Sequence, residues 1–196
     1  RDDRRAREVY QNVEEMLEVE DAGVLISARL RLADGFLEIG ESEKAREHAM
    51  SVHDLSLELN EHQLHARSRV ILGRYYAKTK DSELSLLHYN AALETFSEEA
   101  NPTNAVETEM LLGQVLVDVG RTSEASEHYL DALSIAEAND FRLLQAEILA
   151  RLGTIRGDRS ERVAYLQRSL SVFKDLGAHT RMKEIQNSVH RALMGR

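Results

Sequence analysis

Two histidines stand three residues apart in the segment Glu61-His62-Gln63-Leu64-His65, where a helix is expected to begin. Imidazole nitrogens at this spacing can approach the same metal ion, and zinc, copper and nickel are the ions that imidazole favours. The alternative interpretation is two solvated polar side chains beside a loop, and we favour it. A metal-dependent hydrolase built on His62 and His65 stays open as the last of three functional hypotheses.

Other residues that could support catalysis form no recognisable arrangement. Neither a phosphate-binding glycine loop nor an H-E-x-x-H motif occurs, and the chain has no cysteine for thiolate chemistry, disulfides or zinc. Paired carboxylates such as Glu14-Glu15 and Glu98-Glu99 are typical of solvated helix faces. We therefore predict that the protein is not an enzyme and holds neither a cofactor nor a metal.

The net charge and the hydropathy of the chain exclude two classes of partner, nucleic acids and membranes. A formal net charge of -9 argues against direct binding of nucleic acid or anionic membranes, which needs a basic surface. No apolar run approaches the roughly 20 residues that span a bilayer, and no secretory signal opens the chain. We expect a cytoplasmic protein. Because the chain begins at Arg1 without a methionine, we also expect it to be a fragment of a longer protein.

A leucine followed by a small residue recurs every 40 residues along the chain. These pairs are Leu32-Ala33, Leu72-Gly73, Leu112-Gly113 and Leu152-Gly153. Other columns keep the interval: large apolar residues (Phe36, Tyr76, Leu116), turn residues (Gly40, Lys80, Gly120), small residues (Ala45, Ser85, Ala125) and a mixed set (Ala49, Tyr89, Tyr129). Agreement of several columns in one register indicates an internal structural repeat.

Each repeat is predicted to hold two helices, since apolar residues recur at three- and four-residue steps and the chain has a single proline. The first helices are expected over residues 22–39, 64–79, 103–119 and 143–156, and the second over 43–59, 83–99, 123–138 and 161–175. Ser42, Asp81 and Thr122 occupy expected N-cap positions, and Asn101-Pro102 fits a cap followed by a first-turn proline.

Glycine occupies the same position of the repeat inside three of these helices. In a helix interior, glycine lowers stability by about 1 kcal/mol relative to alanine. Close approach of paired helices would compensate for that cost. We expect Gly73 to face the neighbourhood of Ser85, and Gly113 that of Ala125.

A leucine before a small residue, an aromatic three residues later, and the alanine and tyrosine columns resemble tetratricopeptide repeats over about residues 25–137. The resemblance implies an all-α, right-handed α-solenoid of antiparallel helix pairs. We expect one domain over 1–196, with a half repeat at 1–20, repeats at 22–60, 62–100, 102–139 and 141–176, and a terminal helix at 179–194.

The chain departs from the common pattern in its period of 40 rather than 34 residues. The longer period resembles the repeats of large bacterial transcription activators, peptide-sensing regulators and kinesin light chain. HEAT-like repeats are the structural alternative, and the Leu-Gly and Ala/Tyr columns argue against them. Leu133 and Leu170 are only 37 residues apart, so the fourth repeat lacks about one helical turn between its helices.

In the family that the chain resembles, the first helices line a concave groove that binds a partner. Carried over by phase, the polar groove residues are Asp34, Glu38, Arg67, Arg74, Lys78, Glu107, Gln114 and Asp118, with Glu147 in the fourth repeat. Arg67, Arg74 and Lys78 share one face of their helix at steps of seven and four. They either pair with acidic groups of a partner or are neutralised by acidic groups across the groove, and both states can alternate.

These observations favour a protein- or peptide-binding scaffold module of a bacterial regulatory or signalling protein. The alternative is a homo-oligomerisation module of a transcription regulator, because an apolar flank around Val9, Val13 and Leu17 needs a cover. A homodimer would supply that cover.

Overall fold

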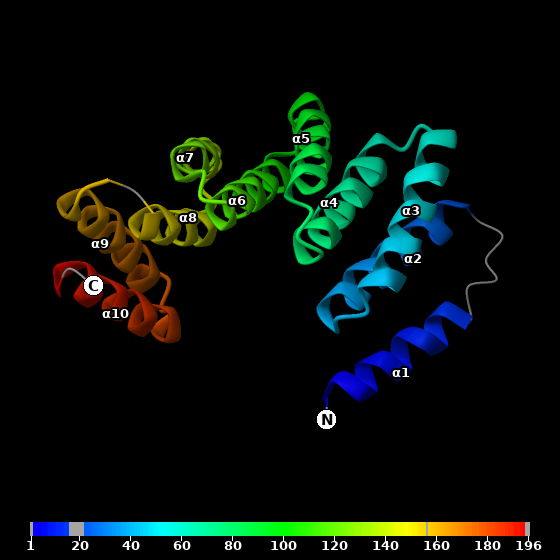
Figure 1. Ribbon diagram of the computed structural model, residues 1–196, viewed down its shortest axis with the longest axis horizontal. Coiled ribbons are helices and arrows are strands. Elements are labelled where there is room, and N and C mark those ends of the chain that lie inside the picture. The colour runs from blue at the N-terminus through cyan, green and yellow to red at the C-terminus, as the bar shows by residue number, and fades with distance from the viewer. Residues whose placement is uncertain (1, 16–21, 156, 195–196) are drawn as a thin grey trace. The chain divides into compact units, whose positions relative to one another are not determined.

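The computed structural model describes residues 2–15, 22–155 and 157–194, and these residues are helices joined by short turns (Figure 1). The chain divides into two compact units, residues 1–99 and 100–196. The first unit contains α1 (Asp2–Glu15), α2 (Ala22–Glu38), α3 (Ser42–Glu58), α4 (His62–Lys78) and α5 (Ser82–Glu98). The second contains α6 (Pro102–Asp118), α7 (Thr122–Ala138), α8 (Arg142–Ile155), α9 (Arg159–Asp175) and α10 (His179–Met194).

The fold is all-α, as predicted, and within each unit consecutive helices pack as antiparallel pairs. The predicted helices are all present, and most begin one or two residues before the expected start. Whether the repeats together form one domain stays a prediction. In the described part of the chain, no helix is both long enough and apolar enough to cross a membrane.

The 40-residue period arises from a turn that repeats every 20 residues. Gly40 and Gly120 have φ of 84° and 80°, and Lys80 has φ of 68°, so the predicted turn set adopts left-handed backbone. Asn60, Ala100 and Asp140 do the same between repeats. At Lys80 the amide bonds to the Ala77 carbonyl and the next amide bonds to the Tyr76 carbonyl, which is the Schellman pattern that ends a helix.

This turn also decides which residues cap the following helix. Asp81 and Asn101 are N-caps, and their side chains accept hydrogen bonds from the amides of Leu84 and Asn104, as predicted. The prediction for Ser42 and Thr122 is wrong, because both are the first residues of their helices. The residue directly after the left-handed position takes the N-cap place, whatever its side chain.

Two of the three recurrent glycines accommodate aromatic rings. A Cβ at Gly73 would lie 2.5 Å from Cε1 of Tyr89, and a Cβ at Gly113 would lie 2.5 Å from Cε1 of Tyr129. Ser85 donates a hydrogen bond of 2.9 Å to the Gly73 carbonyl, so the predicted proximity of these two residues is confirmed. The side-chain atoms nearest to a Cβ at Gly113 belong to Tyr129, and the proximity of Gly113 to Ala125 stays a prediction.

The shortened fourth repeat loses its residues from the end of its first helix. α8 has 14 residues, whereas α6 has 17, and α9 regains the full length of 17. Asp158 caps α9 by accepting a hydrogen bond from the Glu161 amide. Leu166 of α9 lies against Gly153 of α8. A Cβ added to Gly153 would be 2.6 Å from Cγ of Leu166. The pairing of α8 with α9 therefore preserves the glycine contact despite the deletion.

α1 packs on α2 through an aromatic contact. The ring of Tyr10 lies edge-on to Phe36, with 5.7 Å between centroids, and covers Gly35. Val9 and Val13 on the same helix are 53% and 40% exposed. Leu17, the third member of the predicted apolar flank, lies outside the described residues.

Candidate functional site

The first helices α2 and α4 of the first unit are joined by polar side chains. Nη1 of Arg74 lies 2.9 Å from Oδ1 of Asp34, and the two side chains are 35% and 41% exposed. Lys78 donates a hydrogen bond from Nζ to the Leu37 carbonyl of α2. These contacts lie at a surface that is open to solvent, so a partner can reach both cations.

Asp34 is the electrostatic centre of this group. Partial burial raises the pKa of its carboxyl group; Arg74 and Arg67 oppose that rise, and Glu38 reinforces it. Arg67 and Glu38 are exposed and form no hydrogen bond or ion pair with other described residues. Of the five residues predicted here, the structure pairs Asp34 with Arg74, ties Lys78 to α2 and leaves two side chains in solvent.

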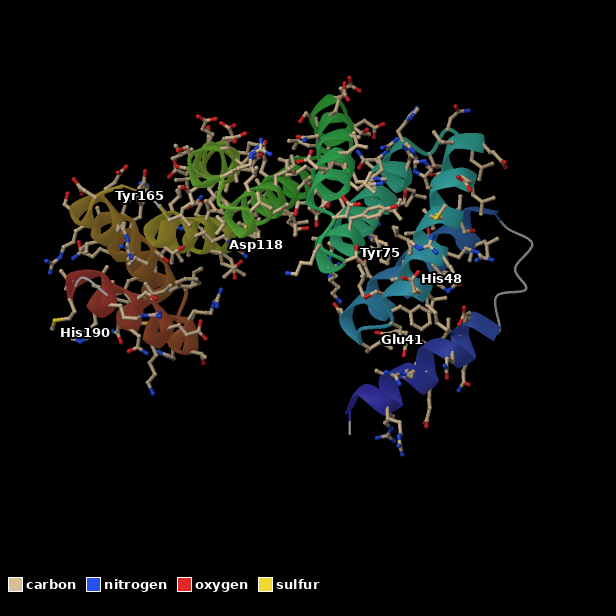
Figure 2. All side chains as sticks on the ribbon, viewed as in Figure 1. Glu41, His48, Tyr75, Asp118, Tyr165 and His190 are labelled. Atoms are coloured by element: carbon tan, nitrogen blue, oxygen red, sulfur yellow. The ribbon has the colours of Figure 1, made fainter. Side chains whose placement is uncertain are left out.

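The second unit shows a related contact between α6 and α8. Nη1 of Arg151 donates to Oε1 of Gln114 at 2.6 Å, and Nε2 of Gln114 donates to Oδ1 of Asp118 at 2.9 Å. Asp118 projects from the C-terminal end of α6 (Figure 2). Glu107, which was also predicted as a groove residue, is exposed on the same helix.

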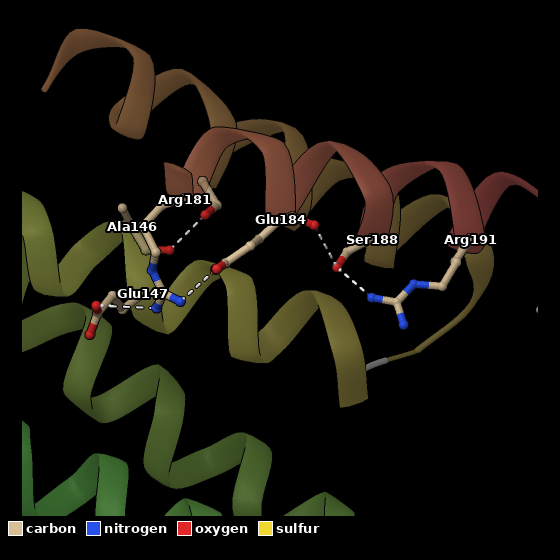
Figure 3. Close-up of polar contacts among 7 residues, drawn as sticks. Ala146, Glu147, Arg181, Glu184, Ser188 and Arg191 are labelled. Carbon is tan, nitrogen blue, oxygen red and sulfur yellow. Dashed lines mark hydrogen bonds and ion pairs between the residues drawn. The ribbon is translucent and has the colours of Figure 1, made fainter. Parts of the chain in front are cut away.

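A further contact of this kind links α8 to α10 (Figure 3). Arg181 lies between two carboxylates, 3.3 Å from Oε1 of Glu147 and 2.7 Å from Oε2 of Glu184. Its guanidinium also lies over the Phe173 ring, 5.8 Å from the centroid. These contacts raise the pKa of Arg181, chiefly through the hydrogen bond to Glu184, and keep its charge fixed.

Three arginines thus reach back from one first helix to the one before it within a unit: Arg74 to Asp34, Arg151 to Gln114 and Arg181 to Glu147. The sequence predicted Arg74, Gln114 and Glu147 but missed Arg151 and Arg181. Arg151 lies one helical turn before Thr154, the residue in the Arg74 column. A search one turn along the same face would have found it.

The histidines suspected of metal binding lie elsewhere. The ring of His65 packs on that of His53 from α3, with 4.3 Å between centroids and 39° between planes. Burial lowers the pKa of His65 to about 4, and His53, Arg69 and His62 add to the effect. Among the described residues no group of three or more histidines and acids is placed to hold a metal ion.

One titratable pair is enclosed in the second unit. Nδ1 of His128 in α7 lies 2.6 Å from Oε2 of Glu109 in α6, and Glu109 is almost fully buried. The hydrogen bond to Glu109 raises the pKa of His128, against the opposing effect of burial. The pair is structural, because it lies inside the α6–α7 contact.

A family model for the tetratricopeptide repeat matches residues 110–139. No curated protein matches the chain. Among solved structures, a signal transduction ATPase with a tetratricopeptide repeat sensor from Pyrococcus horikoshii is similar, with a TM-score of 0.81 at 14% identity. The match covers 95% of this chain and 30% of that one.

Two further structures are similar. Aspartyl phosphate phosphatase F from Bacillus subtilis matches with a TM-score of 0.80 at 14% identity, over 93% of this chain and 49% of that one. A Rap protein complexed with competence and sporulation factor matches with a TM-score of 0.64 at 14% identity, over 92% and 57%. The chain therefore spans less than half the length of the first two structures, and at these identities the likeness shows the fold.

Proposed function

Because the chain is of the tetratricopeptide-repeat type, we propose that it is a protein- or peptide-binding scaffold module of a bacterial regulatory or signalling protein. The observation that carries the proposal is the half-exposed Asp34–Arg74 pair, with Arg67 and Lys78 on the same face of α4 as Arg74. Exposed ion pairs contribute only about 0–1 kcal/mol to stability, so a partner's acidic group can replace Asp34 at little cost.

The second unit offers a matching row of polar groups. Arg151, Gln114 and Asp118 form hydrogen bonds that a partner could replace, and Glu107 lies exposed nearby in sequence. Two of the similar structures support a role in regulation, since one carries a tetratricopeptide repeat sensor and another is a Rap protein with a bound factor. In this proposal the first helices supply the contacts, and the second helices hold them in place.

The test is capture of a partner with the chain as bait, followed by affinity measurement with Arg74→Gln and Lys78→Gln variants. Glutamine is preferred to glutamate at residue 74 because a carboxylate there would face Asp34. We expect both variants to stay folded and to bind the partner at least several-fold more weakly. Arg4→Gln on α1 is the control, since it removes the same charge from an exposed position elsewhere. Undiminished binding by both α4 variants would refute this site.

A second candidate function is self-association through α1. Val9 and Val13 lie four residues apart, on one face of the helix, and both are exposed although Tyr10 is packed against Phe36. Light scattering at several concentrations tests this candidate. It predicts a dimer whose mass falls to that of one chain in the Val9→Asp variant, and a monomer at every concentration would refute it.

A further inference from the structure

α4 carries polar residues on two opposite faces. His65 and Arg74 are nine residues apart, which places them about 180° apart around an ideal helix. Arg74 points toward Asp34 of α2, whereas His65 contacts His53 of α3. The histidine-bearing face is therefore separate from the partner surface proposed above.

Three helices of the first unit contribute an imidazole to this second face. His53 of α3 and His65 of α4 are partly stacked, and His88 of α5 stacks on Tyr76 of α4 with 5.3 Å between ring centroids and 10° between planes. Arg69 lies one helical turn after His65 and acts electrostatically on all three rings. The imidazoles and the guanidinium thus form one cluster on α3, α4 and α5, which we call the histidine cluster.

Three ring nitrogens of the histidine cluster are buried without a hydrogen-bond partner in the described part of the chain. Nδ1 of His53, Nε2 of His65 and Nδ1 of His88 are buried and have no hydrogen-bond partner among the described residues. Arg69 forms no hydrogen bond or ion pair with any described residue either. Buried polar groups are normally hydrogen-bonded, and each one left without a partner costs about 1–3 kcal/mol.

A single carboxylate of the described residues acts on the histidine cluster. The charged groups that act on the three rings are Arg69 and His62 of α4 and Asp54 of α3, and Asp54 is exposed. This is unusual in a chain with 34 acidic residues against 25 lysines and arginines. Because Arg69 forms no ion pair with a described residue, its guanidinium is available to an external anion.

The ring arrangement argues for an anion rather than a metal ion. A metal ligand points its nitrogen at the ion in the plane of its ring. The rings of His53 and His65 instead overlap at 4.3 Å with a tilt of 39°, and no third ligand joins them. The ring nitrogens are buried, so an oxyanion would have to displace the ring edges before their N–H groups could donate to it, as a guanidinium does.

We propose that the histidine cluster binds an oxyanion, a phosphate or carboxylate group of a ligand, with Arg69 as the fixed charge and with His53 and His65 taking up protons as the anion binds. Without the anion, burial and the neighbouring cations keep both imidazoles neutral near pH 7. A bound anion reverses the sign of the local field and favours the imidazolium forms. Affinity should then rise as the pH falls, by up to about tenfold per pH unit for each proton taken up.

The first experiment is an NMR titration of the histidine ring protons in the full chain, with and without inorganic phosphate. Phosphate should raise the titration midpoints of His53 and His65 and leave the signals of His179 and His190 on α10 unchanged. A parallel titration with acetate distinguishes a site for phosphate groups from one for carboxylates. Unchanged midpoints with both anions, or equal responses of all histidines, would overturn the proposal.

The second experiment compares Arg69→Gln with Arg67→Gln, which removes the same charge two residues away on the face that carries Arg74. Arg69→Gln should abolish saturable phosphate binding at about pH 6, whereas Arg67→Gln should retain it. Circular dichroism establishes that each variant is folded. If both variants bind phosphate like the parent chain, the site is not at Arg69 and the proposal fails, without consequence for the Arg74 surface.

Discussion

The α-carbon of Gly73 in α4 lies directly against the ring of Tyr89 in α5, so that a Cβ there would stand 2.5 Å from Cε1 of the ring. Tyr89 is almost fully buried and cannot swing into solvent. The contact recurs between Gly113 and Tyr129 in the second unit. Glycine and tyrosine therefore act as a size-matched pair between the two helices of a repeat.

The first prediction is that Gly73→Ala destabilises the protein although alanine favours helix. Overpacking typically costs about 1–3 kcal/mol, which should exceed the gain of about 1 kcal/mol in helix propensity. Urea unfolding followed by circular dichroism measures the difference. The first repeat has alanine at both corresponding positions, Ala33 and Ala49, and both are buried.

That natural pair suggests the control. In the double variant Gly73→Ala/Tyr89→Ala, the added methyl group occupies space that the ring has vacated. The two changes together should cost less than the sum of the single changes, with a coupling energy of about 1–3 kcal/mol. Strict additivity would mean that the close approach is not what selects glycine at residue 73.

The second prediction concerns the left-handed turn at Lys80. A residue with a side chain in this conformation carries a strain of about 1–2 kcal/mol, which glycine would remove. Glycine also has greater freedom in the unfolded chain, and this offsets part of the gain in stability. Lys80→Gly should therefore stabilise the protein by about 0.5–1 kcal/mol, measured as a shift in the urea midpoint. Gly40→Ala is the mirror control, because φ is 84° and nothing lies within 4 Å of the added carbon. It should destabilise by a similar amount, and a gain on Gly40→Ala would contradict the explanation.

The third prediction concerns acid stability. Burial lowers the pKa of His65 to about 4, below the unfolded value of about 6.5, so the unfolded chain binds the proton more tightly. The stabilisation from neutral His65 is complete above about pH 6.5 and is lost as the pH falls toward 4. This loss is on the order of 1–3 kcal/mol. His128 acts in the opposite sense, because its raised pKa stabilises the fold below about pH 6.5 and this contribution fades as the pH rises.

A His65→Gln variant isolates the first of these effects. Its stability, measured by urea unfolding at a series of pH values, should fall less steeply below about pH 6.5 than that of the parent chain. Asn187→Gln, which changes an exposed side chain of α10 without removing a titratable group, should give a curve parallel to the parent curve. Parallel curves for both variants would show that His65 does not titrate abnormally in the folded chain.

Sequence and structure agree where a feature repeats locally. The turn at Lys80 was predictable because Gly40 and Gly120 occupy the same phase, and left-handed backbone favours glycine. The caps at residues 42 and 122 were misplaced because serine and threonine are good cap residues in isolation. The turn geometry nevertheless puts residues 41 and 121 at the cap.

Features that depend on several helices were not predictable. His53, His65 and His88 are separated by 12 and 23 residues and lie on three helices, so no local spacing reveals their cluster. The same holds for Arg181, whose partner Glu147 is 34 residues earlier in the chain, on another helix. To predict which side chains meet across two helices, one must know how the helices are aligned along their length. A single sequence does not show that alignment.

The last prediction follows from the Asp34–Arg74 pair and rests on the proposed function. In the free chain Asp34 occupies Arg74 at 2.9 Å, so it competes with an acidic group of a partner. Asp34→Asn removes the competing charge but keeps the shape of the side chain. Its free energy of unfolding should change by no more than about 1 kcal/mol, because the ion pair is only half-buried and partial burial of Asp34 already disfavours its charged form, which raises its pKa. Affinity for an acidic partner should increase. The matched control is Asp131→Asn, which removes the same charge from an exposed position on α7, a second helix, and should leave the affinity unchanged. If Asp34→Asn weakens binding, Asp34 contacts the partner directly or orients Arg74 for it, and the competition between the carboxylates is disproved.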